Sequence, residues 1–188
     1  MNFVPNMAGL RGAGGTQFEF GLEVPNPRAS HLDDLRHIEL RAKMSRTSTG
    51  MRLQHSTSAS DGVWIPYIQN VCVYGYASGG TLWMGSGPFS GCHVAFFMQG
   101  GRLGMAHVAV DGSGDAMKAW ESFSGRSGVT VLNKWKVPLA INGTKAMGTY
   151  IFLDLTNPTK VSLTQMDVAV TQMGGDRGAV FAVKSILS

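Results

Sequence analysis

Most of the chain alternates hydrophobic and polar residues with a period of two, the pattern of half-buried β-strands. Residues 16–24 (TQFEFGLEV) place Phe18, Phe20 and Leu22 on one side of an extended chain. The same alternation predicts strands over residues 37–44, 51–55, 129–137, 149–155, 161–171 and 179–186. Turns rich in Gly, Asn, Pro and Ser separate these segments, so the pattern indicates a β-rich protein with many connections.

A second group of segments is apolar almost throughout, as in strands that are buried on both faces. Residues 63–77 are of this kind, but Pro66 cannot donate a ladder hydrogen bond, so we expect two short strands there. Residues 81–84 lead into the turn sequence SGPFSGC, and an apolar strand over 93–98 follows it. A glycine-rich turn then connects to a returning strand over 104–110, which predicts an antiparallel hairpin.

Helical signals are few. Ser30 resembles the N-cap of a short helix, and residues 115–123 carry Met117, Trp120 and Phe123 at helical spacing. The predicted fold is therefore of the β-rich α+β class, a sandwich of two mixed sheets with a few short helices. Residues 1–15 lack periodicity and are expected to form a flexible N-terminal arm, with residues 16–188 forming a single catalytic domain.

Composition and charge narrow the functional classes. The chain has 188 residues, of which 44% are hydrophobic and 15% charged, enough apolar material for one core. A net charge of +4 is far below that of dedicated nucleic-acid binders, so no nucleic-acid partner is expected, although six basic residues within 28–52 form a locally positive segment. No stretch is long and apolar enough for an integral membrane segment, and the first residues lack the apolar region of a cleaved signal peptide.

The candidate chemistry lies in residues 86–107. Cys92 follows a turn and His107 lies on the returning strand, so the hairpin can bring a thiol and an imidazole together. An imidazole that takes the thiol proton produces a thiolate, which attacks carbonyl or amide carbon. Ser86 can hold the imidazole in one tautomer through its hydroxyl or carbonyl oxygen. Gly91 frees the turn to bend, and the main-chain amide of Cys92 is the leading candidate donor to an oxyanion.

A structural interpretation competes with this one, because cysteines that are not in disulfides are among the most buried residues and a core histidine can simply be hydrogen-bonded. Cys72 and Cys92 are both expected to be reduced. The histidines and cysteines never occur at zinc spacings, and no calcium loop or phosphate-binding loop is present. The sequence therefore predicts no metal and no cofactor.

The order of motifs along the chain favours the catalytic interpretation over the structural one. Residues 89–92 (FSGC), an apolar strand, a glycine-rich turn, a strand with a central histidine and a short helix containing tryptophan follow one another. This order resembles the catalytic region of the glutamine deamidase group of cytotoxic necrotizing factor and Burkholderia lethal factor, which carries a Leu-Ser-Gly-Cys motif within a β-sandwich. The resemblance covers roughly residues 82–123 and implies Cys92 as nucleophile, His107 as base and Ser90 as a residue that shapes the site. Ser86 stands where related enzymes carry a threonine that orients the histidine.

The resemblance implies a cysteine-dependent deamidase that converts a glutamine of a host or target protein to glutamate. It also implies a toxin or effector that is secreted without a cleaved signal peptide and acts in the cytoplasm of a target cell. Three alternatives remain open: a transglutaminase, in which an amine takes the same thioester; a cysteine protease; and a β-sandwich binding module in which Cys92 is silent.

Overall fold

The computed structural model describes residues 3–24, 34–58, 61–110, 114–142, 145–157, 159–170 and 177–187. The helix expected to begin at Ser30 starts outside these residues. The elements, in chain order, are β1 (Gln17–Gly21), β2 (Leu35–His37), β3 (Leu40–Arg46), β4 (Gly50–His55), β5 (Gly62–Pro66), β6 (Cys72–Tyr76), β7 (Trp83–Phe89), β8 (His93–Gln99), β9 (Arg102–Val108), α1 (Asp115–Ser124), β10 (Val129–Lys136), β11 (Ala140–Asn142), β12 (Lys145–Asp154), β13 (Ser162–Val170) and β14 (Arg177–Leu187).

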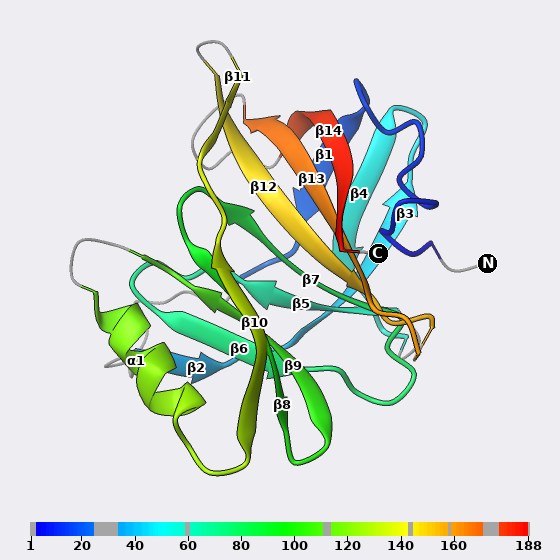
Figure 1. The fold of residues 1–188 in the computed structure, drawn as a ribbon. Helices are drawn as coiled ribbons and strands as arrows, with labels where there is room; N and C mark the ends of the chain where they lie inside the picture. Colours follow the sequence, from blue (N-terminus) through cyan, green and yellow to red (C-terminus); the bar gives the residue numbers. More distant parts are fainter. Residues whose placement is uncertain are drawn as a thin grey trace.

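The larger sheet closes on itself. Its strand order is β11-β12-β13-β14-β1-β4-β3-β5-β7, and β12 also pairs with β7, so eight strands form a barrel (Figure 1). The remaining strand, β11, pairs with the first residues of β12 and extends beyond the barrel wall. The predicted β-rich fold with mixed sheets is confirmed, since β1–β4, β5–β7 and β2–β6 are parallel and the other pairs antiparallel. The predicted sandwich of two open sheets is wrong, because the larger sheet is closed into a barrel.

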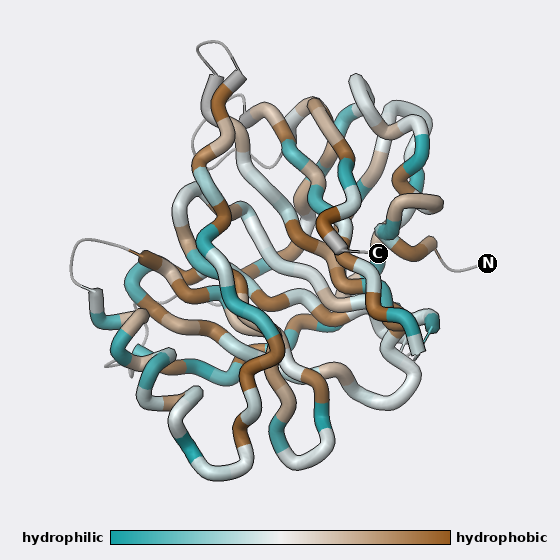
Figure 2. The backbone as a smooth tube through the Cα atoms, in the orientation of Figure 1, coloured by the Kyte–Doolittle hydropathy of each residue, from teal (hydrophilic) through white to brown (hydrophobic). Residues whose placement is uncertain are grey.

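The second sheet has the order β10-β8-β9-β6-β2 and packs against the outside of the barrel. Three apolar clusters result. One fills the barrel, a second lies between the barrel wall and the smaller sheet, and a third lies between that sheet and α1. Figure 2 shows the corresponding alternation of hydrophobic and hydrophilic residues along several strands. The alternation of the sequence thus sorts each strand's side chains between two adjacent layers.

The local structure around the site differs from the prediction at three points and agrees with it at a fourth. The segment expected to end at residue 84 continues as β7 to Phe89, so the turn before Cys92 is shorter than the sequence indicated. Strand β11 was not predicted, and α1 is the one helix in the described part of the chain. The break in residues 63–77 is confirmed, because β5 ends at Pro66 and β6 begins at Cys72.

The described residues of the expected N-terminal arm contact the barrel. Leu10 and Ala13 are buried in the same cluster that fills it. The Asn6 side-chain amide donates a hydrogen bond of 2.7 Å to Asp154, and the Arg46 guanidinium donates one of 2.8 Å to the carbonyl of Gly9. Residues 3–15 are therefore part of the packed structure.

Candidate active site

Cys92 and His107 lie in the apolar layer between the barrel and the smaller sheet. Strands β8 and β9 pair antiparallel, with Val94 opposite His107. Cys92 precedes Val94 by two residues and shares its cluster, so both side chains are on the face toward the barrel. A residue two positions from a directly opposed pair is a diagonal neighbour, about 7–8 Å away between Cα atoms. The hairpin therefore places the thiol and the imidazole on one face as diagonal neighbours.

Ser86 fixes the tautomer of His107. Its hydroxyl donates a hydrogen bond of 2.7 Å to the carbonyl of Ile65, the neighbouring residue in parallel strand β5. The same oxygen lies 2.9 Å from His107 Nδ1, and all three groups are buried. A hydroxyl has one proton, and it is already directed at Ile65, so the oxygen must accept from Nδ1–H. The lone pair of the imidazole is consequently on Nε2.

His107 Nε2 is buried and has no hydrogen-bond partner among the described residues. Burial also lowers the pKa of His107 from 6.5 to about 3, because the charged form would lose its hydration. The imidazole is therefore neutral at physiological pH, with an unoccupied acceptor atom. A neutral imidazole is the form that general-base activation of a cysteine requires. In the structure, however, Nε2 makes no hydrogen bond to the Cys92 thiol, so the two groups are close on one face of the hairpin but not joined.

The loop before Cys92 is held by the segment that follows β10. Gly91 has a φ of +109°, which side chains rarely adopt, so glycine is needed there for conformation. Its amide donates a hydrogen bond of 3.0 Å to the carbonyl of Val137, and the Val137 amide donates one of 2.9 Å to the carbonyl of Cys92. The Gly91 amide is therefore not available to an oxyanion, and its contribution is to the shape of the turn. Ser90 is exposed at the tip of this turn.

Sequence reasoning missed two aromatic neighbours of the histidine. The Phe89 ring stacks on the His107 ring with centroids 4.0 Å apart and planes 12° apart. Tyr67, in the link between β5 and β6, approaches the same ring with a centroid distance of 5.3 Å. Phe89 was interpreted as a turn residue because Gly and Pro surround it, although in the structure it ends β7 and is buried.

A buried polar cluster continues from Phe89 along the barrel wall. Thr149 is the register partner of Phe89 on β12, and its hydroxyl donates a hydrogen bond of 2.8 Å to Asp167. The Gln165 amide donates one of 2.7 Å to the same carboxylate, and the Lys184 ammonium lies 3.6 Å from its other oxygen. The sequence held no signal for this cluster, because its members come from three strands.

The remaining titratable residues are separate from this arrangement. Burial raises the pKa of Cys72 to about 12, so that thiol stays protonated. Neither Cys72 nor Cys92 forms a disulfide. The pKa of His93 is lowered, first by burial and then by Lys134 and Lys136. Within the described ranges, no group of three or more His, Cys, Asp and Glu side chains is placed to hold a metal ion.

The comparisons identify no relative. No protein-family model matches the chain, and no curated protein matches it. In the part of the chain that the structure describes, no helix combines the length and apolar character needed to cross a bilayer. Any functional assignment therefore depends on the geometry of the site and on the sequence motif.

Proposed function

We propose that the protein is a cysteine-dependent glutamine deamidase acting on a target protein, with Cys92 as nucleophile, His107 as base and Ser86 as the positioning residue. The observation that supports this most directly is the bonding of Ser86. Because the Ser86 hydroxyl donates to Ile65, His107 must carry its proton on Nδ1 and its lone pair on Nε2. That is the tautomer able to accept the thiol proton.

In the proposed reaction, His107 Nε2 takes the proton of the Cys92 thiol, and the sulfur forms a bond to the carboxamide carbon of a glutamine side chain. The tetrahedral intermediate collapses by breaking its carbon–nitrogen bond, and the imidazolium gives its proton to the nitrogen, which leaves as ammonia. A water molecule then loses a proton to Nε2 and attacks the thioester carbon. The carbon–sulfur bond breaks, the sulfur regains a proton, and glutamate is released.

The low pKa of His107 has two consequences in this scheme. Burial disfavours the imidazolium, so proton transfer from Cys92 is uphill and depends on the attraction between the imidazolium and the thiolate formed with it. The imidazolium remains a strong acid in its buried setting, which favours rapid donation to the departing nitrogen. Transglutamination differs only in that an amine takes the thioester in place of water.

The proposal is tested by incubating the purified chain with a cell lysate and mapping glutamine-to-glutamate conversion by mass spectrometry. We expect one or a few specific sites with the wild type and none with Cys92→Ser. Cys72→Ala is the matched control, because it removes the other buried thiol, and it should retain the conversion. Cleaved peptides in place of deamidated ones would instead identify a cysteine protease. Addition of a primary amine separates transglutamination, which would yield the amine conjugate.

A non-catalytic binding domain is the second candidate, and burial favours it. Cys92 is only 7% exposed and His107 is fully buried, as expected of core residues. This candidate predicts equally slow alkylation of Cys72 and Cys92 in the folded protein. The deamidase predicts that Cys92 reacts much faster.

As an effector, the protein would act in the cytoplasm of a target cell after secretion without a cleaved signal peptide. This part of the proposal follows from the motif resemblance alone.

A further inference from the structure

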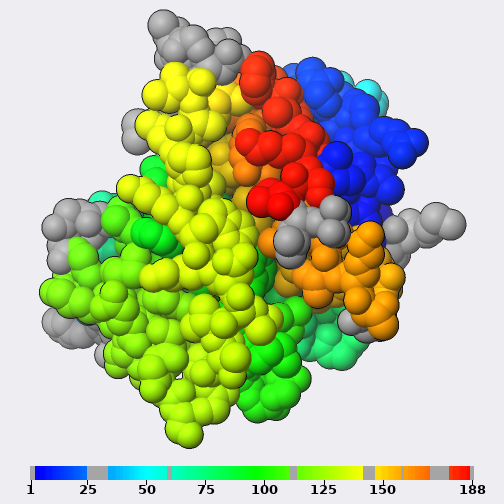
Figure 3. Space-filling model, in the orientation of Figure 1, coloured from blue at the N-terminus to red at the C-terminus, as the bar shows by residue number. Residues whose placement is uncertain are grey.

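Residues 129–142 form a continuous strip that crosses the face of the molecule. The strip consists of β10, a short link over residues 137–139, and β11. In Figure 3 it is part of the yellow-green to yellow band that crosses this face of the molecule, in which the neighbouring β12 has a similar yellow. Among the described strands, β10 pairs with β8 alone and β11 with β12 alone, so each leaves one edge open. An open edge presents backbone N–H and C=O groups to which an extended peptide can add.

The side chains of the strip are unusually apolar for a surface. Val131, Leu132, Leu139 and Ile141 are exposed by 41%, 55%, 49% and 65% respectively. Soluble proteins usually cover such a row of large apolar residues, and a row next to an open strand edge is a typical protein-binding surface.

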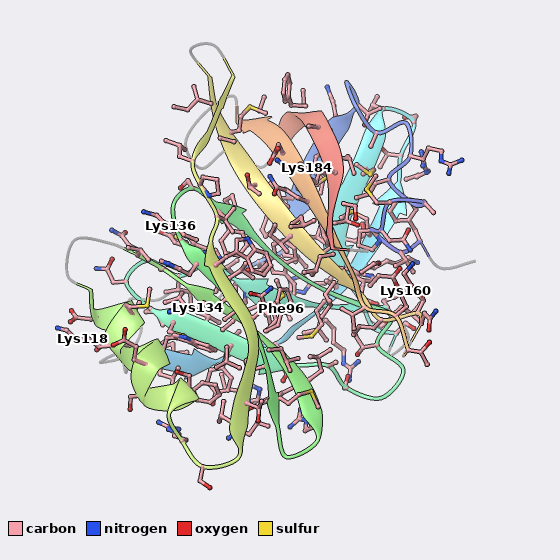
Figure 4. The ribbon with its side chains drawn as sticks, in the orientation of Figure 1. Phe96, Lys118, Lys134, Lys136, Lys160 and Lys184 are labelled. Carbon is pink, nitrogen blue, oxygen red and sulfur yellow. The ribbon has the colours of Figure 1, made fainter. Side chains whose placement is uncertain are left out.

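The charge of the strip has one sign. Lys134 and Lys136 are its ionisable residues within 129–142, and both are exposed. Figure 4 shows them along β10, on the same side of the molecule as Lys118 of α1 and away from Lys160. The positive segment noted in the sequence is less available, since Arg52 is 2.6 Å from Glu19 and Arg46 donates to backbone carbonyls.

The strip passes directly beside the candidate nucleophile. Val137, in the link between β10 and β11, is hydrogen-bonded to both Gly91 and Cys92. Lys136 lies opposite His93, the residue that follows Cys92. A peptide bound along the outer edge of the strip would therefore be separated from the backbone of Cys92 by one strand.

From these observations we infer that the strip over residues 129–142 docks the glutamine-bearing segment of the target as an extended chain that is acidic and apolar. This inference rests on the proposed function, because the docked segment is the substrate of Cys92. Acidic residues would pair with Lys134 and Lys136, and apolar residues would cover Leu132, Leu139 and Ile141. The open edges would supply backbone hydrogen bonds.

Lysines on an edge strand also serve another purpose, because they discourage pairing between edges of two molecules. The β10 ladder in addition has an irregular register between Val131 and Asn133, and such bulges interrupt edge pairing. These devices protect against self-association, whereas the exposed apolar residues on either side of the lysines favour binding. The two roles predict different results when the lysines are reversed to glutamate. If the lysines bind the target, reversal weakens peptide binding; if they only protect the edge, reversal causes self-association and leaves peptide binding unchanged.

The test uses binding, so that it is independent of catalysis. Two synthetic, fluorescently labelled peptides share a central glutamine and apolar residues, and differ in having acidic or basic flanks. Each is titrated with the Cys92→Ser protein, and the affinity is measured by fluorescence anisotropy at low salt. A single exposed charge pair contributes little, but two lysines attract the acidic flanks and repel the basic ones, so we expect the acidic peptide to bind about tenfold more tightly than the basic one.

Lys136→Glu and Lys160→Glu form a matched pair, since each reverses one exposed lysine and changes the net charge equally. We expect Lys136→Glu to weaken binding of the acidic peptide about threefold to tenfold, and Lys160→Glu to leave it unchanged. Leu139→Asp should weaken the binding of both peptides. Circular dichroism checks that each variant is folded.

Equal binding of both peptides, or equal effects of the two lysine reversals, would overturn the inference. So would a concentration-dependent dimer, seen by sedimentation and abolished by Leu139→Asp, because a second copy would then occupy the strip. Self-association of Lys134→Glu/Lys136→Glu with unchanged peptide binding would show that the lysines only protect the edge. Peptide binding as expected, together with no deamidation in lysate, would reject the proposed chemistry while the docking surface stands.

Discussion

Replacing His107 by asparagine is expected to flatten the pH dependence of stability. Its pKa is 6.5 in the unfolded chain and about 3 in the folded protein, because burial penalises the charged ring. Between these two values the unfolded chain binds a proton that the folded protein does not. The stabilisation from burying a neutral ring is therefore complete above about pH 6.5 and is lost progressively as the pH falls toward 3.

The size of the effect follows from the two pKa values of His107. One pKa unit corresponds to about 1.4 kcal/mol. The free energy of unfolding should therefore fall by nearly that amount for each unit by which the pH is lowered between the two pKa values of His107. Integrated from about pH 7 to about pH 4.5, the contribution of His107 is about 2.5 kcal/mol. This range stays above the usual pKa of carboxylates, and the difference between the wild type and a His107 variant removes the contributions that the two proteins share.

The assay is urea unfolding at several pH values for the wild type, His107→Asn and His93→Asn. Asparagine can place its amide nitrogen near the position of Nδ1 and donate to Ser86, so the variant removes the titration while keeping that hydrogen bond. We expect the wild type to lose about 2.5 kcal/mol more stability on acidification than His107→Asn. His93→Asn should also lose more than His107→Asn, because it keeps the fully buried His107. Equal slopes for wild type and His107→Asn would refute the conclusion that His107 is buried in its neutral form.

Three further substitutions test the contacts around the site. Ser86→Ala leaves the buried Ile65 carbonyl and His107 Nδ1 without their partner, so we expect a loss of about 1–3 kcal/mol in urea unfolding and slower alkylation of Cys92. Gly91→Ala meets no neighbouring atom but forces a side chain onto a φ of +109°, and it should cost about 1–3 kcal/mol; an unchanged midpoint would contradict that backbone geometry. Thr149→Val removes one donor from a buried carboxylate, and thermal unfolding should show a loss of about 1–2 kcal/mol.

Much of the secondary structure was predictable because side-chain alternation directly reflects which face of a strand is buried. The helix at 115–123 and the hairpin of β8 and β9 follow from local spacing and are confirmed. The prediction that Met105 and Ala109 share one face of the strand is also confirmed, since both lie in the layer toward the barrel. Alternation does not specify a strand's neighbour, so it could not reveal that β12 pairs with β7 and closes the barrel.

The residues of the candidate site could be selected from the sequence, but the hydrogen bonds that join them could not. A cysteine, a histidine and a serine at the right distances along the chain suggested a possible unit, and the structure places Ser86 2.9 Å from His107 Nδ1. The acceptor of the Ser86 proton is a backbone carbonyl on β5, which has no sequence signature. Phe89 was missed for a different reason, because neighbouring Gly and Pro residues concealed the end of a strand. Its stacking on His107 depends on β7 and β9 approaching across the two sheets.

The most direct test of the account is the rate at which iodoacetamide alkylates each cysteine of the folded protein, followed by mass spectrometry from about pH 6 to about pH 9. If His107 Nε2 accepts the proton of Cys92, that cysteine reacts much faster than Cys72, whose pKa of about 12 keeps it protonated. We expect the advantage to be lost in His107→Asn, which keeps a donor to Ser86. Equally slow alkylation of Cys92 and Cys72, or an advantage of Cys92 that persists in His107→Asn, would contradict the proposed catalytic pair.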